Sequence, residues 1–165
     1  LPCNTIKQFY RIGGKMITRE TLENFELFKG IPAQALDEIT KLCEDVFVTK
    51  GGFVFREGEK ADKLHLLVKG SIALRVNLTS RPDFVTVSIV SRPRQTLGWS
   101  GIVAPNHYTS SAFCEEDSHL IAIPADKFMQ VLKAHPAAGL QVVLRITEII
   151  ADRLRNSHQA LLKTM

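Results

Sequence analysis

The side chains that most often perform chemistry in proteins stand far apart from one another in this sequence. Its histidines form no His-x-His pair and no His-x-x-Glu-His spacing, the patterns that bring ring nitrogens onto one metal ion. They are His65, His107, His119, His135 and His158. A Gly-x-Ser-x-Gly nucleophile elbow and a phosphate-binding P-loop are also absent from the sequence. We therefore expect no catalytic residues, no metal site and no enzyme.

The cysteines and the hydropathy predict a cytoplasmic protein. Cys3, Cys43 and Cys114 are odd in number and far apart, which is typical of a reducing compartment rather than a disulfide framework. A membrane helix needs a run of about 18 apolar residues, and the sequence contains none. Because no signal-peptide core precedes the first polar segment either, we expect no membrane contact.

The charged residues give little sign of a nucleic-acid partner. Lys and Arg number 21 against 17 Asp and Glu, and no block of like sign occurs. A nucleic-acid binder usually gathers its basic residues on one face, whereas the nearest cluster here is Arg92 and Arg94. The chain of 165 residues suits one domain, and 45% apolar with 23% charged residues is ordinary for a globular protein.

Hydrophobic spacing predicts helices first and then many short strands. Residues 18–43 have helical spacing, and Gly30 and Pro32 separate two helices. Residues 44–123 alternate apolar and polar side chains with the two-residue period of half-buried strands. Turns rich in Gly, Pro and Asn between these strands favour a sandwich, jelly roll or barrel. Residues 1–17 are weakly patterned and are predicted to be a lead-in arm.

Two further helices are predicted over residues 124–165. Pro124 opens a short helix, Pro136 closes it, and a long helix follows. The apolar positions of the long helix cover a wider arc than packing on one body requires. They are Val142, Val143, Ile146, Ile149, Ile150, Leu154 and Leu161. The extra arc predicts a partner helix, most simply that of a second copy in a homodimer, and the alternative is a helix that fills a wide groove across the sheet.

Residues 46–76 carry a family resemblance. Gly52, the strand over residues 53–55, the apolar run over residues 64–68 and the Lys69-Gly70 corner follow the rhythm of cyclic-nucleotide-binding domains. Glycine suits the tight corners of such a β-roll because a side chain would hinder the backbone angles needed there. The chain thus resembles the domain type of catabolite activator proteins and protein kinase A regulatory subunits.

This resemblance covers residues 18–165 and implies a mainly β fold with flanking helices. The expected core is an eight-stranded jelly-roll β-roll, with N-terminal helices before it and a long C-terminal helix after it. The resemblance also places a phosphate-binding cassette, a strand ending in glycine followed by a short helical turn, in residues 97–112. Backbone N–H groups at such a turn attract an anion without a charged side chain. The groups in question belong to Gly98, Ser100, Gly101 and Ile102.

Two substitutions in this cassette predict weak binding of cyclic AMP and cyclic GMP. The family uses a glutamate for the ribose and an arginine for the cyclic phosphate, and Trp99 and Tyr108 stand at those positions. Losing a charge-assisted hydrogen bond of about 1.5 to 3 kcal/mol weakens binding roughly 10-fold to 150-fold. A cassette about one residue short would bring His107 to the arginine position, where a protonated imidazole would replace part of the charge at acidic pH.

Trp99 and Tyr108 each allow two interpretations. Trp99 either fills the hollow where ribose would lie, as core or as a lid, or stacks on the ring of a different, nucleotide-like small ligand. Tyr108 either caps a strand edge or joins Thr109 and Ser110 in hydrogen bonding to that ligand. The candidate ligand-binding residues are Gly98, Trp99, Ser100, Gly101, Ile102, His107, Tyr108, Thr109 and Ser110. No other cofactor is expected.

The resemblance implies a regulatory or sensor domain, and three hypotheses follow. A sensor would bind a small molecule and move its last helices against the β-roll. The alternative is a ligand-independent module for dimerisation or for binding a protein partner. A cupin-like enzyme is the weakest hypothesis, because cupins bind metal through paired histidines. In transcription factors of the family, a helix-turn-helix that reads DNA follows the long helix. The residues of this sequence include the long helix but no helix-turn-helix after it, so we expect no direct nucleic-acid binding from them.

Overall fold

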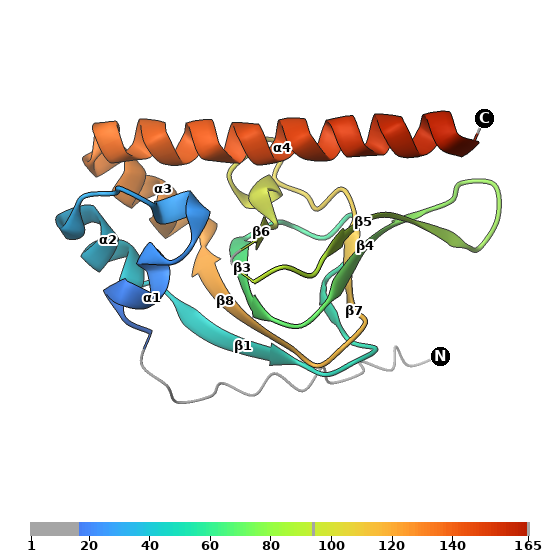
Figure 1. Ribbon diagram of the computed structural model, residues 1–165, viewed down its shortest axis with the longest axis horizontal. Helices are drawn as coiled ribbons and strands as arrows, with labels where there is room; N and C mark the ends of the chain where they lie inside the picture. Colours follow the sequence, from blue (N-terminus) through green and yellow to red (C-terminus); the bar gives the residue numbers. More distant parts are fainter. Residues whose placement is uncertain (1–16, 94, 165) are drawn as a thin grey trace.

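Eight strands in two antiparallel sheets form the body of the computed structural model, which describes residues 17–93 and 95–164 (Figure 1). One sheet has the strand order β1-β8-β3-β6 and the other β2-β7-β4-β5. The strands are β1 (Glu44–Val48), β2 (Phe53–Phe55), β3 (Lys63–Lys69), β4 (Ile72–Asn77), β5 (Phe84–Val90), β6 (Thr96–Leu97), β7 (Ser111–Cys114) and β8 (Ser118–Pro124). The predicted β-roll with flanking helices is confirmed. The predicted lead-in arm, residues 1–17, lies outside the described residues except for Ile17.

The N-terminal segment forms two short elements before α2, where one helix up to Gly30 was expected. They are α1 (Arg19–Glu23) and the 3-10 turn η1 (Glu26–Phe28), and α2 spans Ala33–Thr40. The break follows from Asn24, whose side chain donates to the Glu20 carbonyl at 2.8 Å, and from the extended backbone of Phe25. Phe25 and Phe28 are both buried.

Strand β3 lies between two hydrophobic cores, as its continuous apolar run predicts. Leu64 and Leu66 join the core beneath the helices, whereas Leu67 joins the core between the two sheets. His65 is also buried, at 4% exposure. The central strands therefore form a fixed partition between the helices and the interior of the β-roll.

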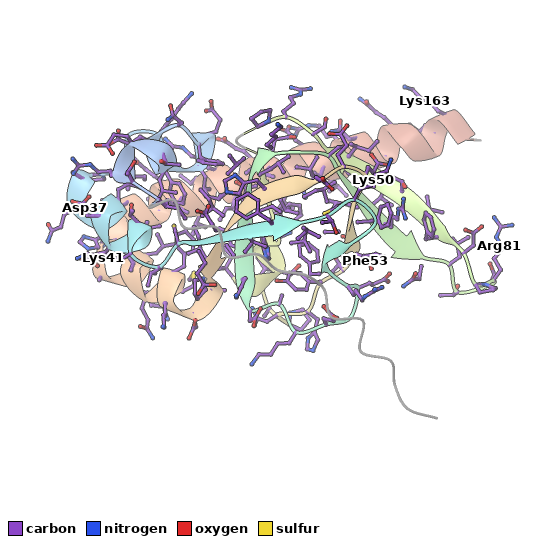
Figure 2. All side chains as sticks on the ribbon, turned by 90° about the horizontal axis from the view of Figure 1, so that it is seen from below. Asp37, Lys41, Lys50, Phe53, Arg81 and Lys163 are labelled. Carbon is purple, nitrogen blue, oxygen red and sulfur yellow. The ribbon has the colours of Figure 1, made fainter. Side chains whose placement is uncertain are left out.

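Strand β5 departs from the predicted half-buried pattern. Phe84 and Ile89 are 46% and 54% exposed, and only Val90 of this strand is fully buried. The strand is at the edge of its sheet and pairs with β4 alone. Their hairpin extends beyond the body with Arg81 near its tip, so little protein is present to cover either face (Figures 1 and 2).

The two C-terminal helices are α3 (Ala125–Ala134) and α4 (Pro136–Thr164). Helix α4 crosses the whole molecule, first over the other helices and then over the β-roll (Figure 1). At Gly139 it approaches α3 so closely that a Cβ atom would lie 2.6 Å from the Leu132 carbonyl oxygen. Glycine allows this contact, which fixes the start of α4 against the body.

The residues that α4 buries against the body differ in part from the expected stripe. Val142 and Ile146 are buried, but Val143, which the apolar spacing groups in one stripe with Ile146 rather than with Val142, is 42% exposed. The position differs because residues one apart lie about 100° apart around a helix, so Val142 and Val143 face different directions. The side chain of Leu161 lies outside the described residues. A second apolar row is exposed to solvent and comprises Leu140, Val143, Leu144 and Leu162.

Candidate ligand-binding pocket

A sharp turn after β6 positions the first candidate residues. Gly98 has φ +80°, a left-handed conformation, and the 3-10 turn η2 (Trp99–Gly101) follows it. A Cβ atom on Gly98 would lie 3.1 Å from both the His65 Nδ1 atom and the Lys63 carbonyl oxygen. Since neither the φ angle nor the space suits a side chain, glycine is required here. The turn directs Trp99 and Ser100 toward a cavity.

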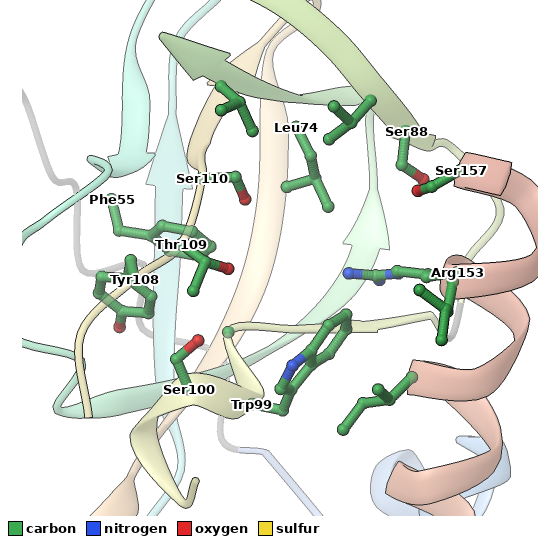
Figure 3. A pocket seen from close by; sticks show the side chains of 15 residues that line it. Phe55, Leu74, Ser88, Trp99, Ser100, Tyr108, Thr109, Ser110, Arg153 and Ser157 are labelled. Carbon is green, nitrogen blue, oxygen red and sulfur yellow. The ribbon is translucent and has the colours of Figure 1, made fainter. Parts of the chain in front are cut away.

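This cavity has a volume of about 250 Å³ and lies between the β-roll and α4 (Figure 3). The β-roll and the turn after β6 contribute Phe55, Leu74, Val76, Val87, Ser88, Gly98, Trp99, Ser100, Tyr108, Thr109 and Ser110. Helix α4 contributes Ile150, Arg153, Leu154 and Ser157. Apolar side chains and hydroxyl groups dominate the lining, and the single charged group is an arginine.

Six of the nine candidate residues line this cavity, and three lie elsewhere. Gly101 packs against Ala125, and Ile102 contacts the core beneath the helices. His107 is exposed, and its Nδ1 atom is 2.9 Å from the Pro105 carbonyl oxygen. The cavity therefore brings together Gly98, Trp99, Ser100, Tyr108, Thr109 and Ser110, whereas the exposed His107 does not supply a charge to it.

Tyr108 offers the cavity its ring, because its hydroxyl is already bonded. The residue is 4% exposed, and its hydroxyl donates to the Lys63 carbonyl oxygen at 2.9 Å. Its ring stacks on Phe55 with the centroids 3.8 Å apart and the planes 11° apart. A buried, stacked and hydrogen-bonded ring is part of the wall itself.

His65 lies behind this wall as a neutral side chain. It contacts Phe55 with ring centroids 5.6 Å apart, and its buried Nδ1 atom has no hydrogen-bond partner. Burial, with a smaller contribution from the positive charge of Lys63, lowers the pKa of His65 to about 3. The imidazole is therefore uncharged at neutral pH and supplies no cation to the pocket.

The cation of the pocket comes from α4. The Arg153 guanidinium lies over the Trp99 ring, 4.2 Å from its centroid, and its Nη2 atom donates to the Thr96 carbonyl oxygen at 2.6 Å. Burial lowers the pKa of Arg153 to about 10, so the group stays protonated at neutral pH. Trp99 accordingly has two roles, since it packs against the helical core and supports the arginine on its ring.

Arg153 was not among the functional residues expected from the sequence. A signal was present, because residue 153 follows Ile146 by seven positions and Ile150 by three, which places it on the inward side of the helix. A positively charged side chain on an apolar helix face is uncommon unless a group that interacts with the charge lies opposite it. The helix pattern alone did not reveal that a cavity lies opposite this position.

Other kinds of chemistry have little support among the described residues. No group of three or more His, Cys, Asp or Glu side chains there is arranged to hold a metal ion. Burial raises the pKa of the Cys43 thiol to about 12 and that of Cys114 to about 11. Protonated, buried thiols are poor nucleophiles. None of the described helices is both long enough and apolar enough to span a membrane.

Comparison with known proteins adds a family match. The family model for the cyclic nucleotide-binding domain matches residues 45–135. A CRP-like cAMP-activated global transcriptional regulator of Mycobacterium tuberculosis is 25% identical over 143 residues, covering 86% of this chain and 61% of the regulator. Glutaminase 1 of Bradyrhizobium diazoefficiens is 27% identical over 150 residues, covering 88% of this chain but 23% of the glutaminase. The chain thus spans only part of the length of these relatives.

Solved structures give the same answer for the fold. A Geobacter metallireducens protein described as cyclic nucleotide-binding is 26% identical with a TM-score of 0.73, covering 84% of this chain and 99% of that one. The Thermus thermophilus catabolite activator protein has a TM-score of 0.66 at 20% identity, covering 82% of this chain and 61% of that one. The second similarity concerns the fold alone.

Proposed function

We propose that the chain, which belongs to the cyclic nucleotide-binding domain family, is a regulatory domain whose pocket binds a small molecule other than cyclic AMP or cyclic GMP. The two cyclic nucleotides would bind this pocket only weakly. The observation that carries this proposal is the shared construction of the pocket. Gly98, Trp99 and Tyr108 supply one wall, whereas Arg153 and Leu154 of α4 supply the other. A bound molecule would touch both parts and could change how they pack.

Three features of the pocket support weak binding of cyclic nucleotides. Trp99 can donate one N–H but accepts no hydrogen bond from a ribose hydroxyl. The Tyr108 hydroxyl is bonded to the Lys63 carbonyl oxygen and carries no positive charge. The cavity of about 250 Å³ is also smaller than the roughly 300 to 1,000 Å³ of pockets for drug-sized ligands. A smaller molecule fits this space better.

Helix α4 is the element through which ligand binding in the pocket would affect a partner protein. Its inward side contributes Ile150 and Arg153 to the pocket, and its outward side exposes an apolar row that includes Leu140, at 62% exposure, and Leu144. Apolar rows on a helix are usually covered by a second helix. We propose that α4 pairs with α4 of a second copy, so that the domain works as a homodimer.

The same exposed row supports a second candidate function. A domain that dimerises through Leu140 and Leu144 without binding any ligand would keep the fold and the partner surface but have no use for the cavity. In that case Trp99 and Arg153 would serve only to pack α4 against the β-roll. The two functions differ in whether a small molecule stabilises the protein.

A thermal-shift screen tests the proposal. Cyclic AMP, cyclic GMP, nucleotides and small metabolites are added to the protein well above their expected dissociation constants, where a ligand raises the Tm by mass action. We expect at least one small metabolite to raise the Tm more than either cyclic nucleotide does. Silence across the screen, together with a concentration-dependent dimer in sedimentation velocity, would contradict the sensor function and favour the interaction module.

A further inference from the structure

We infer that the pocket beneath α4 selects a small, largely apolar molecule bearing one carboxylate, with Arg153 as the group that binds the carboxylate. This inference rests on the proposed function, because it names the ligand class of the same pocket. It places the recognition of charge on the helix rather than on the turn after β6.

The charge of the cavity is unbalanced. Among the described residues, Arg153 is the only ionisable group that lines it besides the Tyr108 phenol, and no carboxylate does. None of the ion pairs between described residues includes Arg153. Its sequence neighbour Asp152 pairs instead with Arg155. A partly buried cation without a carboxylate partner is a favourable site for an anion.

The guanidinium also has hydrogen-bonding capacity to spare. It carries five N–H donors in a planar fork that matches a carboxylate. The one hydrogen bond found for it within the described chain goes to the Thr96 carbonyl oxygen at 2.6 Å. Trp99 covers one face of the group and so holds its plane in position. A carboxylate that approaches through the cavity would therefore meet a donor that is already oriented.

The remaining lining determines what else the ligand must be. Leu74, Val76, Val87 and Ile150 surround the space, with the flat rings of Phe55 and Tyr108 at one end. A cavity of about 150 Å³ accommodates benzene, so 250 Å³ accommodates a ring together with a short carboxylate arm of a few atoms. A molecule of this size would fill the pocket.

The geometry assigns a direction to the ligand. Arg153 extends from α4 into the cavity beside the indole of Trp99, and Thr109 and Ser110 lie across the cavity from it (Figure 3). The carboxylate would lie toward α4 and the apolar body toward Phe55. Because Arg153 also bonds to the end of β6, a bound anion would compete for the guanidinium that links α4 to the β-roll.

Trp99 is the only tryptophan of the chain, so its fluorescence reports on this pocket directly. We would titrate the protein with phenylacetate and benzoate, and in parallel with the neutral phenylacetamide and with cyclic AMP. We expect saturable changes for the carboxylates and at least roughly tenfold weaker binding of phenylacetamide, since it lacks the charge. In Arg153→Gln the dissociation constant for phenylacetate should rise roughly 10-fold to 150-fold.

Arg155→Gln is the matched control, because Arg155 lies on the same helix but is exposed and does not line the cavity. Its affinity for phenylacetate should stay within about twofold of the parent. If Arg153→Gln does not fold, the comparison of phenylacetate with phenylacetamide on the unaltered protein still decides the question. Equal binding of those two compounds, or tight binding of cyclic AMP that Arg153→Gln leaves unchanged, overturns the inference.

The outcomes separate this inference from the proposed function. A neutral compound or a nucleotide could instead bind saturably with no dependence on Arg153. That result would be consistent with a ligand-sensing domain and would contradict only the inference that the ligand bears a carboxylate. If none of these compounds changes the fluorescence of Trp99, the carboxylate site is overturned. The sensor function is overturned as well only if the thermal-shift screen is also silent.

Discussion

The two walls of the pocket are built in different ways. On the β-roll side, Tyr108 is buried, stacked on Phe55 and hydrogen bonded to Lys63, and Gly98 allows no larger side chain. On the α4 side, Leu154 is exposed and Arg153 is held by one hydrogen bond and one ring contact. The β-roll supplies the fixed wall of the pocket, and the helix supplies its charge. Substitutions in the two walls should therefore have different effects.

The largest expected effect is on the stability of the fixed wall. Tyr108→Ala removes a buried ring and should lower the free energy of unfolding by about 3 to 5 kcal/mol. The matched change in the other wall, Leu154→Ala, should lower it by less than about 1 kcal/mol because Leu154 is exposed. Urea denaturation of both variants measures the difference. Similar losses in the two variants would mean that the walls do not differ in rigidity.

The second prediction concerns pH and the residue behind the fixed wall. The pKa of His65 is lowered to about 3 from an ordinary value of 6.5, so the unfolded chain binds a proton more readily than the folded one. Above pH 6.5 the proton equilibrium of His65 does not lower the free energy of unfolding. As the pH falls from 6.5 toward 3, the free energy of unfolding declines by about 1.4 kcal/mol per pH unit.

Denaturation at pH 7.5, 6.5, 5.5 and about 4.5 measures this decline. By about pH 4.5 the parent should have lost about 2 to 3 kcal/mol more than His65→Leu, which has no proton to bind at this position. Parallel pH profiles for the two proteins would show that His65 is not held in its neutral form.

The third prediction concerns the pairing of α4 with a second copy. Leu144→Glu places a charge in the exposed apolar row and should weaken the dimer at least roughly tenfold, since burying a leucine contributes about 1.5 to 3 kcal/mol. Lys127→Glu, at an exposed position of α3 outside this row, serves as the control. Sedimentation velocity over a range of concentrations measures both. An unchanged dimer in Leu144→Glu would place the interface elsewhere.

The smallest of these effects concerns the contact between the two walls. Trp99→Glu would place a carboxylate beside the Arg153 guanidinium, and this internal anion should weaken the binding of phenylacetate about tenfold. Trp99→Phe keeps an aromatic ring without a charge and should change the affinity by no more than a few-fold. Calorimetry measures both variants, because neither retains the fluorescent tryptophan. Equal affinities of Trp99→Glu and Trp99→Phe for phenylacetate would mean that the carboxylate does not bind next to Arg153.

The fold could be predicted from the sequence where a residue pattern is compatible with only one local structure. The continuous apolar run over residues 64–68 predicts a strand buried on both faces, and β3 is such a strand. Gly70, with φ +119°, lies at a corner where a side chain would be strained. The break after Glu23 was missed, because the spacing of Leu22, Phe25 and Phe28 suits a continuous helix as well as a broken one.

The site could be predicted only where the chain supplies it locally. The turn after β6 was found from the resemblance, and Trp99 and Tyr108 do line the cavity. Arg153 comes from a helix more than fifty positions later, and its inward direction depends on how α4 lies across the β-roll. His107 was considered as a replacement cation because a shift of one residue would bring it inward, but its side chain is exposed.

Calorimetric titration of the unaltered protein with cyclic AMP at neutral pH tests the central claim most directly. The family resemblance implies an arginine and a glutamate where Tyr108 and Trp99 stand. Loss of the arginine contact alone is expected to weaken binding roughly 10-fold to 150-fold, and loss of the glutamate contact should weaken it further. The account predicts no saturation below about 100 μM, whereas phenylacetate saturates in the same cell. A dissociation constant for cyclic AMP of about 1 μM or lower would contradict it.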